Sequence, residues 1–118
     1  MGTRQVNLVV DAADPAAQAR FWTEATGWPP ALPSGTALSL RAASGTGPFL
    51  EFLEVPEPKR VKNRLHLDVA PYRGDDHPAE VARLRALGAT PADVGQGDVT
   101  WVVLADPEGN EFCVLSPR

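Results

Sequence analysis

Two side chains in this sequence form a natural acid–base pair, the carboxylate of Glu51 and the imidazole of His66. Each lies in a strand-like segment, and Asn7 and Cys113 hold matching positions in two further segments of that kind. If these four residues meet in one hollow, Glu51 and His66 supply a general base and a general acid for a metal-free isomerase or lyase reaction. The plainer interpretation is a solvated sheet face, where polar side chains cost nothing.

Further polar residues lie on the same predicted faces. The segment 64–70 alternates cleanly and places three of them away from its apolar side: Arg64, His66 and Asp68. A carboxylate of Asp68 or Glu51 is the expected partner of the His66 ring. Glu111 lies two residues before the cysteine, about 6–7 Å along one strand face, and is expected to look into the same hollow.

Two residues have plain structural interpretations beside their functional ones. Cys113 is the only cysteine, and a free cysteine most often serves as a small buried apolar residue. Beside Glu51 and without a cationic neighbour, its thiol pKa is expected to rise unless a metal binds it. Trp101 is interpreted first as a core or interface residue and second as a ring that stacks on a ligand.

The segments that position these residues follow one order, which occurs twice. In the first half a strand is predicted at 5–11, and a helix begins at Asp14-Pro15, with aspartate as N-cap and proline in the first turn. Gly27 suits the left-handed residue that ends this helix. A loop rich in proline and glycine follows, with a weak strand at 28–32, and then strands at 37–43 and 49–55.

The second half repeats this order after a linker at 56–63. A strand at 64–70 leads to a helix that His77-Pro78 opens and Gly88 ends. A weak strand at 90–94 and a strong one at 99–105 follow. The turn 106–110 has proline at its second position, and it leads to a last strand at 111–115.

The repeated order predicts an α+β fold built from two βαβββ modules. Because neither half can bury its sheet face alone, we expect one curled eight-stranded mixed sheet with both helices on its outer face. The modules span about 4–57 and 63–118, within a single domain of 118 residues.

The bulk composition excludes several classes of partner. The net charge of −4 and the shortness of the one basic cluster, 59–64, argue against nucleic acid, so we interpret that cluster as a solvated linker. No apolar run approaches the ~20 residues of a membrane span. The single cysteine excludes an internal disulfide and fits the cytoplasm, as does the lack of a signal-peptide pattern. The chain carries no nucleophile elbow, phosphate loop or CxxC pattern.

Three segments, taken in order, resemble a known family. They carry Asp14-Pro15 with Arg20-Phe-Trp22 and Gly27-Trp28, then Lys62-Asn-Arg-Leu-His-Leu-Asp68, and finally Asp106-Pro-Glu-Gly-Asn-Glu-Phe-Cys-Val-Leu115. Together they resemble the compact bacterial glyoxalase-like domains of the glyoxalase, bleomycin resistance and extradiol dioxygenase (vicinal oxygen chelate) superfamily. The closing Asp-Pro-Glu-Gly-Asn motif is the most specific of the three.

This resemblance implies a cleft in which enzymatic members hold a divalent metal as a Lewis acid. The ligands are usually histidine from the first strand and glutamate from the last strand of each half. Glu51 and His66 keep this pattern, whereas Asn7 replaces the first histidine and Cys113 the last glutamate. The implied metal set is therefore Glu51, His66 and Cys113, with zinc, nickel, manganese or iron as the ion.

Two functions stay open at this stage. The first is an enzyme of the lyase, isomerase or dioxygenase type, with Glu51 and His66 as catalytic residues. The second is a metal-free drug- or metabolite-binding protein of the bleomycin-resistance kind. Both require a small-molecule ligand, and the resemblance also implies a homodimer. The expected ligand-binding residues are Asn7, Arg64, Asp68, Trp101, Glu111 and Cys113.

Overall fold

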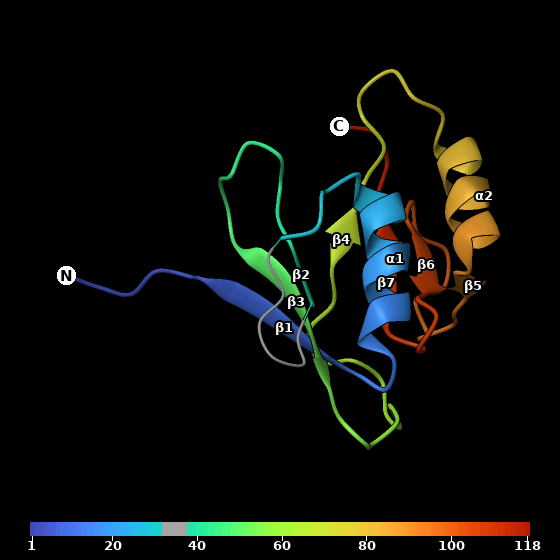
Figure 1. The fold of residues 1–118 in the computed structure, drawn as a ribbon. Coiled ribbons are helices and arrows are strands. Elements are labelled where there is room, and N and C mark those ends of the chain that lie inside the picture. The colour runs from blue at the N-terminus through green and yellow to red at the C-terminus, as the bar shows by residue number, and fades with distance from the viewer. Residues whose placement is uncertain (32–37) are drawn as a thin grey trace. The chain divides into compact units, whose positions relative to one another are not determined.

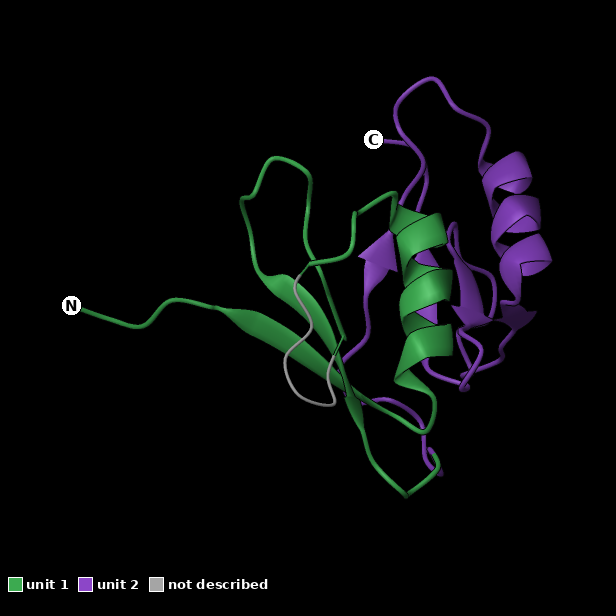
Figure 2. Cartoon of the chain, in the orientation of Figure 1, with its two compact units in different colours: residues 1–58 green, residues 59–118 purple. Residues whose placement is uncertain are grey.

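The computed structural model describes residues 1–31 and 38–118. The chain divides into two compact units, unit 1 at 1–58 and unit 2 at 59–118, which Figure 2 shows in different colours. The part of the predicted proline- and glycine-rich loop at 32–37 lies outside the described residues, as does Ala37, the first residue of a predicted strand. Neither helix in the described ranges has the length and apolarity to cross a membrane.

Unit 1 contains a mixed three-stranded sheet of order β1-β3-β2 (Figure 1). Strand β1 (Asn7–Ala12) runs parallel to β3 (Phe49–Glu54), and β2 (Leu38–Leu40) pairs with β3 in the antiparallel sense. An isolated bridge joins Pro30 to Leu40, where the sequence predicts a weak strand. The strand order is therefore first, last and middle.

Helix α1 (Pro15–Thr26) covers one face of this sheet. As predicted, the Asp14 carboxylate accepts a hydrogen bond from the Ala17 amide at 3.1 Å, and Gly27 ends the helix with a φ of 72°. Phe21 and Trp22 are buried, in an edge-to-face contact with ring centroids 5.1 Å apart. The core of unit 1 thus lies between α1 and the sheet.

Unit 2 repeats the order in a four-stranded sheet, β4-β7-β6-β5 (Figure 1). Its strands are β4 (Asp68–Val69), β5 (Thr90–Pro91), β6 (Val102–Ala105) and β7 (Glu111–Val114). Here too the first strand runs parallel to the last, and β6 is antiparallel to both of its neighbours. The predicted βαβββ order is confirmed in unit 2, and unit 1 follows it except that an isolated bridge at Pro30 stands where its second strand was predicted.

Helix α2 spans His77–Leu87, and its N-cap lies one residue before His77, where we predicted the start of the helix. Asp76 is the N-cap, and its carboxylate accepts the Ala79 amide at 2.9 Å, so His77 lies inside the helix. The His77 ring instead forms a hydrogen bond with the Val114 carbonyl at 3.0 Å, which links α2 to β7. Gly88 ends the helix, as predicted.

Two fold predictions need correction. The structure contains separate three- and four-stranded sheets in the described residues, so a single eight-stranded sheet is not confirmed. The predicted strand 64–70 is reduced to Asp68–Val69, and the Leu65 side chain, expected on the buried face, is 81% exposed. Alternation alone overstated this strand, because β7 pairs with only Asp68 and Val69 of the segment.

Candidate functional site

One face of the unit 2 sheet forms the wall of a pocket of about 330 Å³. Side chains alternate along a strand, so Glu111 and Cys113 of β7 lie on the same face of the sheet. Val103 of the neighbouring strand β6 pairs with Cys113 and shares this face. Asp68 pairs with Cys113 from the other side. Apolar groups complete much of the wall: Val94, Trp101 and Leu115.

A histidine, a carboxylate and a thiol meet on this face. The donor atoms of His66, Asp68 and Cys113 all lie within 4.8 Å of one another. The His66 Nε2 is 3.2 Å from the Asp68 Oδ1, which confirms one of the two expected partners of the ring. We name these three residues the donor cluster.

The thiol of the donor cluster is held in its protonated form. Burial raises the pKa of Cys113, and the nearby Asp68 carboxylate raises it further, both by charge and by accepting the thiol hydrogen. The direction of the shift was predicted, but the carboxylate responsible within unit 2 is Asp68. The prediction of no cationic neighbour is wrong, since the Lys62 ammonium acts in the opposite direction on this pKa.

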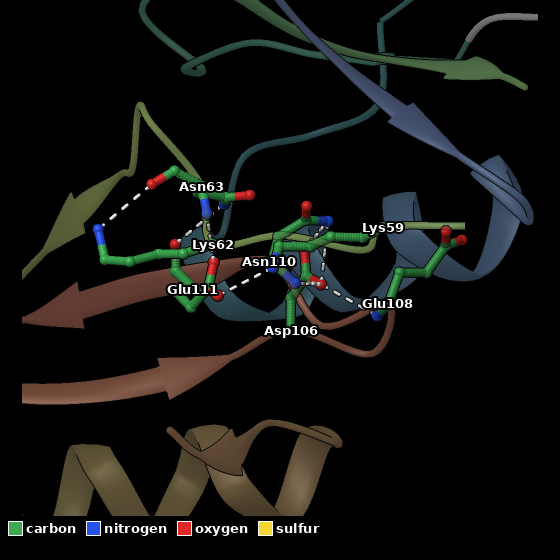
Figure 3. Close-up of polar contacts among 7 residues, drawn as sticks. All are labelled: Lys59, Lys62, Asn63, Asp106, Glu108, Asn110 and Glu111. Atoms are coloured by element: carbon green, nitrogen blue, oxygen red, sulfur yellow. Dashed lines mark hydrogen bonds and ion pairs between the residues drawn. The ribbon is translucent and has the colours of Figure 1, made fainter. Parts of the chain in front are cut away.

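A second polar group is organised around Glu111 (Figure 3). Its Oε1 accepts a hydrogen bond from the Lys59 Nζ at 2.8 Å, and its Oε2 accepts the Asn63 amide at 3.0 Å. The Asn63 side chain in turn donates to the Glu111 carbonyl at 3.4 Å. These contacts, which we name the Glu111 clamp, tie the segment before β4 to β7.

The clamp corrects our interpretation of the basic cluster 59–64 as a solvated linker. The Lys59 side chain is only 17% exposed and forms an ion pair with Glu111. Burial disfavours the charged form of Glu111, but hydrogen bonds from Lys59 and Asn63 outweigh it and lower the pKa of this carboxyl group. Glu111 therefore faces the pocket as a carboxylate with committed partners.

We expect Glu111→Gln to weaken the protein mainly above acidic pH. Because the folded-state pKa lies below the ordinary value of 4.5, the carboxylate adds stability above that value, which is lost as pH falls through the folded pKa. At pH 7 the variant should lose about 1–2 kcal/mol in urea denaturation, and at about pH 3, below the ordinary pKa of 4.5, the loss should be smaller.

The surface pair Glu80–Arg83 offers a matched control for this experiment. Glu80→Gln should cost no more than about 0.5 kcal/mol at either pH, as an exposed pair within a helix does. A loss for Glu111→Gln that is equal at both pH values would contradict the role of its charge.

The turn before β7 fixes where these residues project. Asp106 is buried, and its carboxylate accepts the amides of Glu108 and Asn110 at 3.0 Å each, together with the Asn110 side chain (Figure 3). Gly109 takes a φ of 89°, which favours glycine. The Asp-Pro-Glu-Gly-Asn motif thus sets the register in which Glu111 and Cys113 face the pocket.

Unit 1 holds the other predicted residues in the equivalent arrangement. Glu51 pairs with Val9 in β1, two residues after Asn7, just as Cys113 pairs with Asp68, two residues after His66. The predicted matching of the halves is therefore visible in the registers. The Asn7 Nδ2 donates to the Glu51 Oε2 at 3.5 Å, and the Ser39 hydroxyl donates to its Oε1 at 3.3 Å.

The predicted site residues thus fall into two groups, each described within its own unit. The convergence of Glu51 with His66 and Cys113 stays a prediction. Trp101 lines the pocket with 39% of its surface exposed, so it is not a core residue, and its roles at an interface or against a ligand both stay predictions. Arg64 is exposed and is not among the residues that line this pocket.

Sequence reasoning missed four residues near the pocket: Lys59, Lys62, Asn63 and Gln96. The first three lie in the segment that we interpreted as a linker, and nothing in its pattern shows that it folds back onto β7. Gln96 lies in the loop after β5, where its Oε1 accepts the Val94 amide at 2.9 Å. The nearness of Lys62 and Asn63 to the His66 motif was the one available signal.

The donor cluster suits a divalent cation. Zinc bonds imidazole nitrogen, carboxylate oxygen and thiolate sulfur at ~2.0–2.3 Å, so donors a few ångströms apart can share one ion after small adjustments. Three protein ligands with an open fourth position are the usual set of a catalytic zinc site. Within unit 2 the third donor is Asp68, and the predicted part of Glu51 in the metal site stays a prediction. A thiolate among the donors favours zinc or iron over manganese.

Comparisons with known proteins agree with this fold. The sequence matches the family model described as glyoxalase-like domain over residues 7–115, so the chain belongs to the glyoxalase-like domain family and to the vicinal oxygen chelate superfamily. A search of curated proteins finds no match. The three solved structures described next share 14–18% of the sequence, so they speak for the fold alone.

Three of these structures illustrate the likeness. A glyoxalase/bleomycin resistance protein/dioxygenase family enzyme from Burkholderia phytofirmans has a TM-score of 0.73 at 17% identity, over 95% of this chain and 97% of that one. A glyoxalase-related enzyme from Fulvimarina pelagi has a TM-score of 0.71 at 18% identity, over 96% and 87%. The fosfomycin resistance protein FosX from Listeria monocytogenes, as a mutant complexed with Mn(II) and dihydroxypropylphosphonic acid, has a TM-score of 0.72 at 14% identity, over 100% and 93%.

Proposed function

We propose that this protein binds a small organic molecule in the unit 2 pocket, beside a divalent cation held by His66, Asp68 and Cys113. The observation that carries the proposal is the position of the donor cluster on a wall that is otherwise largely apolar. A few converging polar groups in an apolar pocket are the usual form of a small-molecule site. Mn(II) in the FosX structure supports a metal in this superfamily.

The chemistry that such an ion would supply is Lewis acidity toward an oxygen of the ligand. The chain's own residues would orient the ligand against Trp101 and Val103. The pocket volume lies near the lower end of the ~300–1,000 Å³ range of small-molecule sites, which favours a metabolite over a large drug. We propose that the protein is an enzyme of the lyase, isomerase or dioxygenase type, with Glu51 as a further candidate catalytic residue.

The metal-free alternative is favoured by one contact. The 3.2 Å approach of the His66 Nε2 to the Asp68 carboxylate is the arrangement that aligns a histidine for proton transfer. In this version the Cys113 thiol stays protonated and serves as part of the wall. A binding protein of the bleomycin-resistance type would use the same pocket without turnover.

Elemental analysis of the native protein, followed by zinc titration of the chelator-treated protein, separates these versions. We expect about one zinc or iron per chain, and saturable uptake of one zinc after chelation. Folded protein that neither contains nor takes up a metal would overturn the metal-dependent version.

The assembly and the location belong to this proposal as well. We propose a homodimer, supported by the family likeness, and a cytoplasmic location, supported by the lone unpaired cysteine Cys113. Light scattering coupled to gel filtration measures the first, and a monomer at micromolar concentration would contradict it.

A further inference from the structure

The charged side chains around the unit 2 pocket differ in how fully they are paired with groups of opposite charge. The Asp68 carboxylate lies 3.2 Å from the His66 Nε2, and the Glu111 carboxylate is held by Lys59 and Asn63. The Lys62 ammonium, by contrast, donates only to the Asn63 carbonyl at 3.3 Å and forms no ion pair with any carboxylate of the described residues.

The neutral polar groups of the pocket are committed too. The Gln96 side chain bonds to its own loop, through the Val94 amide and the Ala92 carbonyl. The Asn63 side chain donates to the Glu111 carbonyl. Among the charged side chains that line the pocket, Lys62 is therefore the one whose charged group makes no ion pair with the described residues.

The Glu111 clamp holds Lys62 at this place. Its contacts to Lys59 and Asn63 lie on both sides of Lys62 in the sequence, so the backbone that carries the ammonium is anchored to β7 (Figure 3). Lys62 and Cys113 line the same pocket. Lys62 is exposed, so its ammonium can reach a ligand from a backbone position that the clamp fixes beside a largely apolar wall.

We propose that the unit 2 pocket selects a small organic anion, with Lys62 contacting the anionic group and Trp101 and Val103 contacting the apolar body. This inference rests on the proposed function and extends it by naming the charge class of the ligand. The net charge of −4 would by itself favour a cation. Salt screens charges beyond ~8–10 Å, so a ligand in the pocket responds mainly to the groups that line it. Of these, the Glu111 carboxylate is paired with Lys59 and the Asp68 carboxylate lies beside His66, whereas the Lys62 ammonium has no carboxylate partner among the described residues.

Three matched probes test the sign of the charge: phenylacetate, phenylacetamide and phenethylamine. Each carries one phenyl ring, and they differ as anion, neutral molecule and cation. Binding to the chelator-treated protein is followed by the NMR signal of the Trp101 indole, assigned with Trp101→Phe. We expect phenylacetate to bind about five- to tenfold more tightly than phenylacetamide, with phenethylamine weakest and the preference reduced by salt.

Two variants then assign the preference to one side chain. Lys62→Met keeps the apolar stem and removes the charge, so the anion preference should fall below about twofold, while Lys62→Arg should retain it. Arg60→Met removes an equal charge outside the pocket and should leave the preference unchanged. Equal loss in Arg60→Met, or a preference that survives Lys62→Met, overturns the assignment to Lys62.

The outcomes also separate this inference from the function beneath it. Equal binding of the anion and the neutral amide overturns the anion preference and leaves a small-molecule pocket in place. If none of the three probes shifts the Trp101 signal, the pocket does not take ligands of this size, and the proposed function fails with it.

Discussion

His66→Ala should abolish high-affinity metal binding, lowering zinc affinity by well over 100-fold. Loss of an outer hydrogen-bond partner of a metal ligand typically costs ~10–100-fold, and loss of one of only three ligands must cost more. Asp68→Asn and Cys113→Ser should each weaken binding strongly as well, because their donor atoms lie in the same cluster. Competition with a chromophoric chelator measures all three.

The second histidine provides the matched control. His77 binds the Val114 carbonyl, and His77→Ala should keep zinc affinity within about twofold whatever it costs in stability. Glu51→Ala decides between the two ligand sets, since only the set predicted from the sequence contains Glu51. Unchanged affinity in His66→Ala would remove the donor cluster as a metal site.

Phe112→Ala should be the most destabilising single substitution in unit 2, costing about 3–5 kcal/mol. Phe112 is 1% exposed and is one of the largest fully buried residues of the core, in β7 between Glu111 and Cys113. A loss of this size approaches the whole stability of a domain of ~5–15 kcal/mol.

Urea denaturation followed by circular dichroism measures this loss. Val61→Ala is the control, because the Val61 side chain is 77% exposed and its truncation should change stability by less than about 0.5 kcal/mol. A cost below about 1 kcal/mol for Phe112→Ala would mean that β7 does not anchor the core of unit 2.

The elements predicted best from the sequence are those with local signals. Asp14-Pro15 and Gly27 mark both ends of α1 because capping is decided by the backbone of a few neighbouring residues. The turn at 106–110 was equally clear, since its aspartate satisfies amides only two and four residues away. The matching of the halves followed from the order of these local elements.

The features that sequence reasoning missed depend on contacts between distant segments. The sequence around Lys59 predicts a solvated residue, because its partner Glu111 lies 52 positions later in the chain. The length of β4 is likewise set by how much of β7 lies beside it, so alternation at 64–70 predicted too long a strand. Asp68 belongs to the donor cluster because it pairs with Cys113 across β4 and β7, which places both side chains on one face of the unit 2 sheet.

The burial of Cys113 has a consequence for handling the protein. Peroxide and air attack the thiolate rather than the thiol, and Cys113 is a buried residue whose raised pKa disfavours the thiolate. Oxidation to the sulfenic acid should therefore be slow in the metal-free form. Protein prepared without reductant should therefore keep an unoxidised Cys113. Weak metal uptake by such protein would then have a cause other than oxidation of this metal-binding thiol.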